Sequence, residues 1–198
     1  MKILYSPSSP YSAKCRMAAR YLGIDVKEIK TDTAAEPADL LDSNPLGKIP
    51  TLICPDGRNV YDSLAIMSYL DRLSGGGLYP KKHEKRTDAE VLEALCDGIT
   101  DALVAIVYER RMRPEEKVHQ PVIDRQWGKV ARGLDHLERN MPKTGKKLNG
   151  GHFALAALLG YLDLRFAGQW EEDRPFLAAW RGTFAKRFAD YNELKSNA

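Results

Sequence analysis

The residues with the clearest chemical meaning lie near the N-terminus, in the stretch Ser9-Pro10-Tyr11-Ser12. They follow a short apolar run and read like a Cys-Pro-Tyr-Cys redox motif in which hydroxyls replace both thiols. A thiol pair at the start of a helix exchanges disulfides, because the helix N-terminus lowers the pKa of a thiol there. Two serines cannot carry electrons, but a serine hydroxyl can donate a hydrogen bond to a thiolate. The motif therefore predicts a bound cosubstrate that supplies the thiol itself.

Two further stretches, one typical of a turn and one typical of a helix start, contain polar residues that could bind a ligand. Asn44-Pro45-Leu46-Gly47 is typical of a turn and leads into Lys48-Ile49-Pro50-Thr51-Leu52. Asp62-Ser63 precedes an apolar helical stripe, and we expect Ser63 to be the N-cap of that helix. Because the free N–H groups of a helix N-terminus bind anions, Ser63 could cap the helix and also bind a ligand carboxylate.

The elements that must position these residues alternate between strand and helix. Residues 3–5 form a short apolar run, and residues 25–29 alternate well enough to predict a second strand. The first predicted helix ends at the breaker Gly23, and the helix from Ser63 has an apolar stripe. The order βαβαββα is that of a thioredoxin-like domain, which we place at residues 1–76. Its predicted elements are the strand 3–5, a helix from Pro10 to Gly23, the strand 25–29, the helix 35–41, a hairpin of 51–53 with 59–61, and a helix from Ser63 through Leu73.

Beyond Gly75-Gly76-Gly77 the sequence has no strand signal. We expect a linker at 77–82 and an all-helical domain at 83–198, so the predicted fold class is α/β plus all-α. Apolar residues recur at helical spacing from Leu92 to Ile106 and from Ile123 to Leu137, which predicts two long amphipathic helices. Phe153–Leu162 is apolar on nearly every side and predicts a buried helix. Two short helices are expected at 175–181 and 184–191.

Composition excludes several classes of protein. The 198 residues are 43% hydrophobic and 29% charged, as in ordinary soluble domains. No apolar run approaches the roughly 20 residues needed to cross a bilayer, and no signal peptide is apparent, so we expect neither membrane insertion nor secretion. Cys15, Cys54 and Cys96 lie about forty residues apart, which fits neither a disulfide framework nor a zinc site and favours a cytoplasmic location.

Charge gives little reason to expect a nucleic-acid partner. The chain has 30 basic and 27 acidic residues and a net charge of +3. Its local basic clusters are interpreted as solvated helix ends or loops, and its four histidines show no metal-ligand spacing, so no metal is expected. The clusters are Lys81/Lys82/Lys85/Arg86, Arg110/Arg111/Arg113 and Lys143/Lys146/Lys147.

Together, Ser9-Pro10-Tyr11, the stretch 44–52 and Asp62-Ser63 resemble the cytosolic glutathione S-transferases of the bacterial, serine type, and the resemblance covers the whole chain. It implies glutathione as cosubstrate, with Ser9 stabilising its thiolate. A serine at this place could instead only cap the helix. Ser8, Ser12 and Tyr11 remain alternatives for the thiolate contact, although Ser12 is expected to face solvent. Cys15 is expected to pack in the core.

The resemblance also implies how the rest of glutathione is bound. It implies a cis bond before Pro50, which leaves the backbone of Ile49 free to pair with the cysteinyl residue, and it implies that Lys48 reaches the glycine carboxylate. Asp62 would bind the α-ammonium group and Ser63 the γ-glutamyl carboxylate. It further implies a homodimer in which each thioredoxin-like half faces the helical half of the other subunit.

The resemblance defines the second substrate less well. Tyr11, Tyr108, Arg111 and the C-terminal segment would line its pocket, and the Arg110/Arg111/Arg113 cluster hints at an anionic electrophile.

Many family members begin the buried helix with a Ser/Thr-x-x-Asp capping box, but this chain has Gly151-His152-Phe153-Ala154-Leu155 there. We therefore expect that cap to be missing, with His152 as an imperfect substitute.

Three functions are compatible with these residues. The leading interpretation is a transferase that conjugates glutathione to a small electrophile. The alternative is a non-catalytic protein of the same fold that binds glutathione or a partner. A thiol-disulfide or deglutathionylating enzyme would need cysteine at position 9, where this chain has Ser9.

Overall fold

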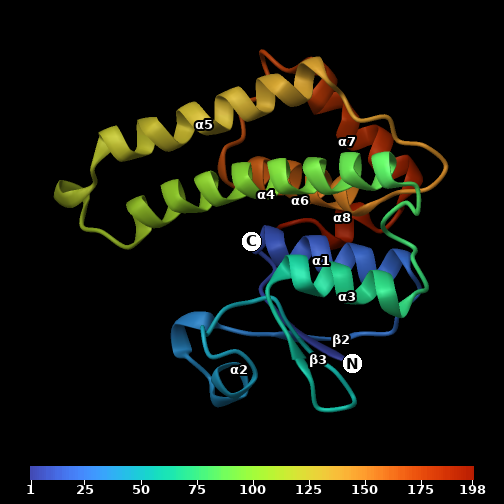
Figure 1. The fold of residues 1–198 in the computed structure, drawn as a ribbon. Coiled ribbons are helices and arrows are strands. Elements are labelled where there is room, and N and C mark those ends of the chain that lie inside the picture. Colours follow the sequence, from blue (N-terminus) through green and yellow to red (C-terminus); the bar gives the residue numbers. More distant parts are fainter.

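A mixed four-stranded sheet forms the lower layer of the molecule in the computed structural model, which describes residues 1–198 (Figure 1). The central strand is apolar on both faces, since Ile3 and Leu4 are both buried. The strand order is β2-β1-β3-β4, with β1 parallel to β2 and antiparallel to β3, and β3 antiparallel to β4. The strands are β1 (Lys2–Tyr5), β2 (Lys27–Lys30), β3 (Thr51–Ile53) and β4 (Asn59–Val60).

Helices in the first half connect the strands. α1 (Pro10–Tyr21) begins with proline at a first-turn position, where its missing N–H is not needed, and it ends before Gly23, which adopts φ +67°. The others are the 3₁₀ turn η1 (Thr33–Ala35), α2 (Ala38–Ser43) and α3 (Ser63–Leu73). α1 and α3 cover the face of the sheet that is turned toward the second half (Figure 1).

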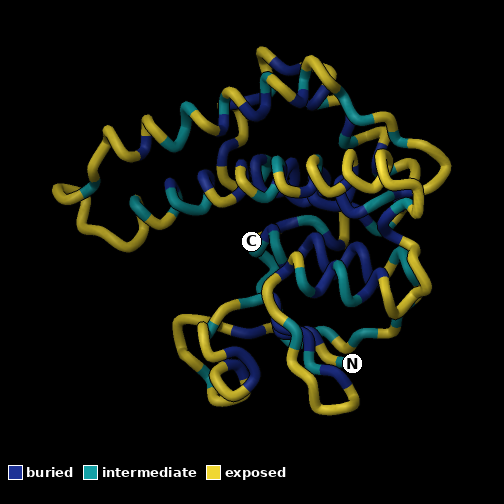
Figure 2. The backbone as a smooth tube through the Cα atoms, viewed as in Figure 1, coloured by how far each residue is buried: buried dark blue, intermediate teal, exposed yellow.

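The second half is entirely helical. α6 is buried along most of its length, as its apolar sequence predicts, and it lies against α4 and α1 (Figure 2). The prediction of two short helices near the C-terminus was wrong, because one helix, α7, continues through residues 182 and 183 and only a single turn follows it. The helices are α4 (His83–Arg111), α5 (Gln120–Arg139), α6 (Gly150–Arg165), α7 (Pro175–Arg187) and α8 (Tyr191–Leu194), with the 3₁₀ turn η2 (Glu115–Lys117) before α5.

The start of α6 corrects a second prediction, because its capping box is present. Asn149 Oδ1 accepts a hydrogen bond from the His152 backbone N–H at 3.1 Å, and His152 Nδ1 accepts one from the Asn149 N–H at 3.1 Å. The usual motif has an acidic or amide side chain at the third helical position, and here a neutral imidazole accepts the hydrogen bond from the N-cap N–H instead. Gly150 and Gly151 leave room for Tyr79 and the Ala89 carbonyl, which a Cβ atom would approach to 2.6 and 2.7 Å.

A buried ionic cluster joins the two halves between α1 and α4. Lys14 Nζ lies 3.1 Å from Glu93 Oε1 and 2.6 Å from Asp97 Oδ2, and the Tyr79 hydroxyl donates to Glu93 Oε2 at 2.5 Å. Burial alone would lower the pKa of Lys14, but Asp97 and Glu93 outweigh it and raise that pKa above its usual value. Around this cluster a continuous apolar core runs from the sheet to α6. The sheet-plus-helix architecture confirms the predicted fold class.

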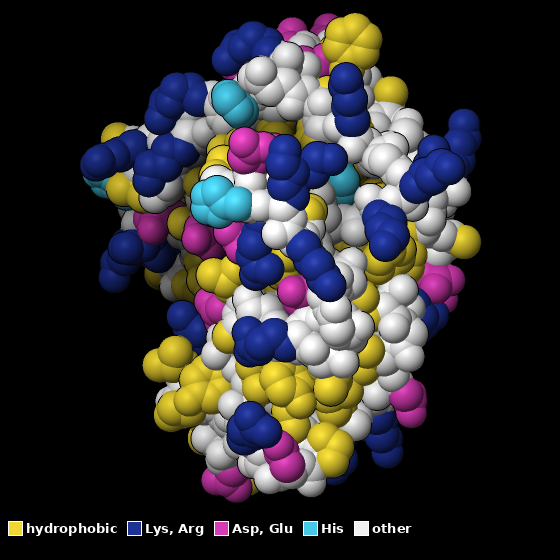
Figure 3. Space-filling model, turned by 45° about the vertical axis from the view of Figure 1, so that its right-hand side comes forward, with side chains coloured by type: hydrophobic (Ala, Val, Ile, Leu, Met, Phe, Trp, Pro, Cys, Tyr) yellow, Lys and Arg dark blue, Asp and Glu magenta, His cyan; other side chains and the backbone are white.

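All three basic clusters lie on the surface, as predicted, including Arg110, Arg111 and Arg113. Lys81, Lys82, Lys85 and Arg86 at the start of α4 are exposed, as are the three lysines at 143, 146 and 147. Lys82 pairs with Glu84 at 2.8 Å and Arg86 with Glu90 at 2.8 Å. On the face seen in Figure 3, Lys and Arg side chains are interspersed with Asp and Glu. No helix combines the length and apolar character that crossing a membrane requires.

Candidate functional site

All the residues proposed from sequence to bind the cosubstrate lie on one cleft of about 2040 Å³. The sheet half supplies one wall of the cleft from three places: the start of α1, the loop before β3 and the start of α3. The helical half supplies the opposite wall from α4 and α6. The residues predicted from sequence that line this cleft are Ser9, Lys48, Ile49, Pro50, Asp62 and Ser63.

Ser9 occupies the turn between β1 and α1 and is the N-cap of α1. Its Oγ accepts a hydrogen bond from the Ser12 backbone N–H at 3.2 Å. Because the oxygen is the acceptor in this bond, the hydroxyl hydrogen remains available for donation into the cleft. The capping interpretation and the thiolate interpretation of Ser9 are therefore compatible.

The alternatives to Ser9 differ in their surroundings. Ser12 is fully buried, so the expectation that it faces solvent was wrong, and it does not line the cleft. Ser8 lines the cleft, with its Oγ 3.2 Å from that of Ser6. The Tyr11 hydroxyl is already committed to Asp101, to which it donates a short hydrogen bond. Burial, together with this bond, raises the pKa of Tyr11, which keeps the hydroxyl protonated.

Cys15 packs in the core, as predicted, and does not face the cleft. It is fully buried, its Sγ lies 3.6 Å from the Ser63 carbonyl oxygen, and burial raises the pKa of its thiol. Cys54 and Cys96 are also buried and unpaired. The described chain has no group of three or more side chains arranged to hold a metal ion.

The loop before β3 is held by Asn44, a residue that sequence reasoning treated only as part of a turn. Its Nδ2 donates to the Lys48 carbonyl at 2.9 Å, and its Oδ1 accepts from the Leu46 N–H at 3.0 Å. Thr51 Oγ1 donates to the same Lys48 carbonyl at 2.9 Å. The Ile49–Pro50 bond is cis, as the resemblance implied. The Lys48 side chain is exposed and makes no ion pair.

The start of α3 differs from the prediction in one respect, because Asp62 rather than Ser63 is its N-cap. Asp62 has extended backbone angles, and its Oδ1 accepts from the Leu64 N–H at 3.0 Å. Asp and Ser are nearly equal as N-caps, so residue preference alone could not choose between them. Ser63 becomes the first helical residue. It is 5% exposed, and its hydroxyl makes no hydrogen bond within the chain.

The helical wall contains both predicted and unpredicted residues. Tyr108 and Arg111 of α4 line the cleft as expected. Tyr161 and Arg165 of α6 also line it, although no pattern in the sequence indicated either residue. Among the arginines of the α4 cluster only Arg111 lines the cleft. The C-terminal segment does not line it. That segment instead supports the N-terminal turn, where the Asn197 N–H donates to the Pro7 carbonyl at 3.1 Å.

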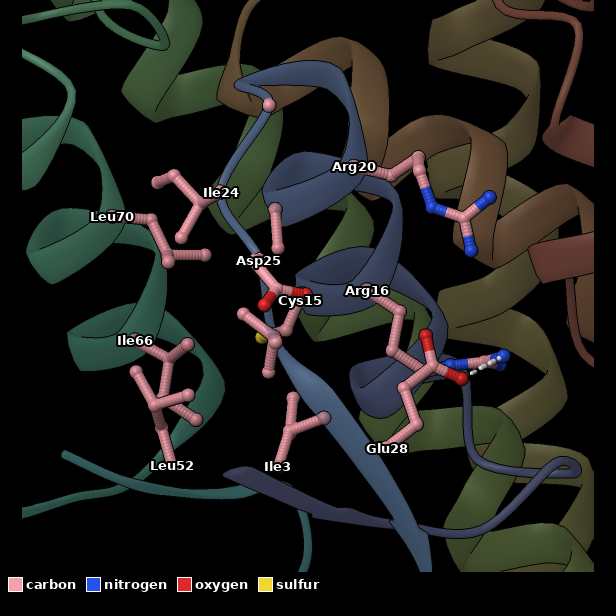
Figure 4. Close-up of a pocket in the computed structure, with 13 residues that line it drawn as sticks. Ile3, Cys15, Arg16, Arg20, Ile24, Asp25, Glu28, Leu52, Ile66 and Leu70 are labelled. Atoms are coloured by element: carbon pink, nitrogen blue, oxygen red, sulfur yellow. Dashed lines mark ion pairs between the residues drawn. The ribbon is translucent and has the colours of Figure 1, made fainter. Parts of the chain in front are cut away.

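A second cavity, of about 390 Å³, lies in the sheet half between α1, α3 and β2 (Figure 4). Ile24, Leu52 and Leu70 are among its apolar lining, and at one side Arg16 Nη2 pairs with Glu28 Oε2 at 2.6 Å. None of the predicted binding residues lines this cavity, so the larger cleft is the candidate site.

Comparison with known proteins identifies the class that this fold and cleft define. The model of the glutathione S-transferase N-terminal domain matches residues 8–73, and that of the C-terminal domain matches residues 120–182. The chain is 31% identical to the uncharacterized GST-like protein YibF of Escherichia coli K12, over 89% of this chain and 90% of that protein. The chain belongs to the glutathione S-transferase family.

Solved structures agree with this assignment. A glutathione S-transferase from Methylobacillus flagellatus KT with glutathione bound superposes with a TM-score of 0.89 at 38% identity, over 99% of each chain. A family member from Pseudomonas fluorescens Pf-5 with bound S-(propanoic acid)-glutathione has a TM-score of 0.84 at 30% identity, over the full length of both chains.

Proposed function

We propose that this protein is a glutathione transferase that stabilises the glutathione thiolate and conjugates it to an electrophilic small molecule. The observation that carries the proposal is the meeting of three elements on one cleft: the Ser9 hydroxyl at the start of α1, the loop before Pro50, and the start of α3. The structural relatives that hold glutathione or a glutathione thioether support the same assignment.

Ser9 supplies the chemistry in this proposal. A free thiol has a pKa of about 8.5 and is mostly protonated at neutral pH. A hydroxyl donor and the positive end of α1 both favour the anion, and each pKa unit of lowering corresponds to about 1.4 kcal/mol. The thiolate sulfur then attacks the electrophile, so that a carbon–sulfur bond forms and the leaving group departs with its electron pair.

Binding of the rest of glutathione is assigned to short side chains and backbone. Ile49 offers its N–H and C=O to the cysteinyl residue in the manner of an added strand. Lys48 lines the cleft and its ammonium makes no ion pair, which suits it to the glycine carboxylate. The free hydroxyl of Ser63 and the N-terminus of α3 suit the γ-glutamyl carboxylate, and Asp62 suits the α-ammonium group.

Calorimetric titration with glutathione followed by assays with a panel of electrophiles tests the proposal. Binding together with turnover supports it. Binding without turnover of any electrophile would instead favour the non-catalytic glutathione-binding protein, and absence of binding would reject both. A thiol-disulfide enzyme is disfavoured by Ser9 and by the burial of all three cysteines.

We further propose a homodimer in the cytoplasm. Leu73 on α3 and Val91 on α4 are 51% and 62% exposed and do not line the cleft, and a facing subunit would cover such apolar side chains. The three unpaired cysteines suit a reducing compartment. A mass near that of one 22.2 kDa chain in light scattering at micromolar concentration would exclude the dimer.

A further inference from the structure

The helical wall of the cleft carries two arginines at matching places. Arg111 is the last residue of α4 and Arg165 the last residue of α6, and these two helices pack against each other. Both side chains line the cleft that also holds Ser9 and Tyr11. We propose, on the basis of the function above, that the second substrate is an electrophile bearing a carboxylate, and that Arg111 and Arg165 bind this carboxylate.

The distribution of charge on the helical wall favours an anion near the C-terminal ends of α4 and α6, where Arg111 and Arg165 lie. Asp97 is paired with Lys14 at 2.6 Å, Asp101 accepts from the Tyr11 hydroxyl, and Glu90 is paired with Arg86 at 2.8 Å. Each acidic group of α4 that lines the cleft thus has a partner within the chain. Arg111 and Arg165 form no ion pair within the chain, so no carboxylate of the protein neutralises either guanidinium group.

The other arginines of the α4 cluster are placed differently. Arg113 pairs with Glu109 at 2.9 Å, and neither Arg113 nor Arg110 lines the cleft. The sequence cluster therefore contributes one residue to the pocket, and the fold supplies the second from α6.

Tyr161 lies close to both candidate arginines. Burial raises the pKa of its hydroxyl, and the positive charges of Arg165 and Arg111 act against that increase. The hydroxyl stays protonated at neutral pH and adds a neutral donor beside the two cations. Val104, Val107 and Tyr108 line the same wall and provide apolar surface for the body of the electrophile. A guanidinium can bind a carboxylate through two parallel N–H donors, which sets its orientation as well as its position.

The test uses two electrophiles of nearly the same shape, 4-chloro-3-nitrobenzoate with a carboxylate and 4-chloro-3-nitrobenzamide with a neutral carboxamide. Comparing their ratio between variant and parent cancels the difference in their intrinsic reactivity. In each, the thiolate forms a bond to the ring carbon and chloride leaves with the bonding electrons. We expect the ratio of kcat/KM for benzoate over benzamide to fall about 5- to 30-fold in Arg111→Gln and in Arg165→Gln, the range for loss of one charged hydrogen bond at a solvent-accessible site. The ratio in Arg110→Gln should stay within about twofold of the parent.

Calorimetry with the two purified thioether products gives a second readout that needs no turnover. The carboxylate product should bind the parent more tightly than the carboxamide product, and Arg111→Gln should remove most of that difference. Equal binding of the two products by the parent, or a difference that Arg111→Gln and Arg165→Gln leave intact, overturns the carboxylate site while the proposed function stands. If neither product nor glutathione binds the parent, the proposed function fails as well.

Discussion

The two walls of the cleft are built by different means. The sheet wall uses backbone groups and short side chains at Ser9, Ile49 and Ser63, each fixed by a local turn or helix start. The helical wall uses long side chains on α4 and α6, which are positioned only because these helices pack together. The sheet wall, built from backbone groups, suits a ligand whose shape does not change. The side chains of the helical wall can be substituted one at a time without disturbing the fold.

The largest effect is expected where the two walls are joined. Lys14→Met should lower the free energy of unfolding by about 3 to 5 kcal/mol, because it leaves the fully buried carboxylate of Glu93, and the partly buried one of Asp97, without their cation. Denaturant unfolding measures this loss. Lys85→Met, an exposed lysine of α4 without an ion pair, is the control and should change stability by less than about 0.5 kcal/mol. Equal effects of the two variants would mean that the cluster does not hold the walls together.

On the sheet wall, Ser9→Ala should separate binding from chemistry. We expect glutathione affinity within a few-fold of the parent, a higher pKa of the bound thiol, and turnover lowered by about 10- to 1000-fold, the range for loss of one preorganised donor. Ultraviolet absorbance of the bound thiolate against pH checks the pKa directly. Ser8→Ala is the matched control, and a larger effect there than in Ser9→Ala would move the thiolate contact to Ser8.

At the start of α3, Ser63→Ala and Asp62→Asn should each weaken glutathione binding by about 1 to 3 kcal/mol, because each leaves a charged ligand group without a partner. Asparagine is chosen at Asp62 because its side-chain oxygen can still accept from the Leu64 N–H and keep the cap. Calorimetry measures the affinity and thermal unfolding checks the fold. Parent-like affinity in both variants would contradict the γ-glutamyl assignment.

The smallest effect concerns the helical half and depends on pH. Burial lowers the pKa of His152, whose neutral Nδ1 accepts the capping hydrogen bond. The unfolded chain therefore binds a proton more readily, so stability is complete above the usual histidine pKa of about 6.5 and decreases as pH falls below it. His152→Gln retains a capping side chain without a titrating group. Between pH 7.5 and 5.5 the parent should lose more thermal stability than this variant, and identical losses would exclude the histidine as the cause.

The sequence could predict what depends on neighbouring residues. The helix start at Ser9, the turn at Asn44 and the helix start at Asp62 are local, so their residue types predicted these elements. The chemistry assigned to Ser9 and Asp62 stays a prediction. Prediction from sequence failed at the N-cap of α3, because Asp62 and Ser63 have nearly equal N-cap preferences. It also failed at the start of α6, where Asn149 and His152 form a capping box from a rare pair of residues. Arg165 could not be found at all, because its approach to Arg111 results from the packing of two helices that a 38-residue stretch of chain separates.

The burial of every cysteine also makes the chain a convenient carrier for spectroscopic labels. Cys15 and Cys96 have no exposed surface and Cys54 is 4% exposed, so alkylating reagents should leave the native chain unmodified. A single cysteine introduced on either wall would then be the only reactive thiol, and a fluorophore or spin label could be attached there without replacing any native residue in the core.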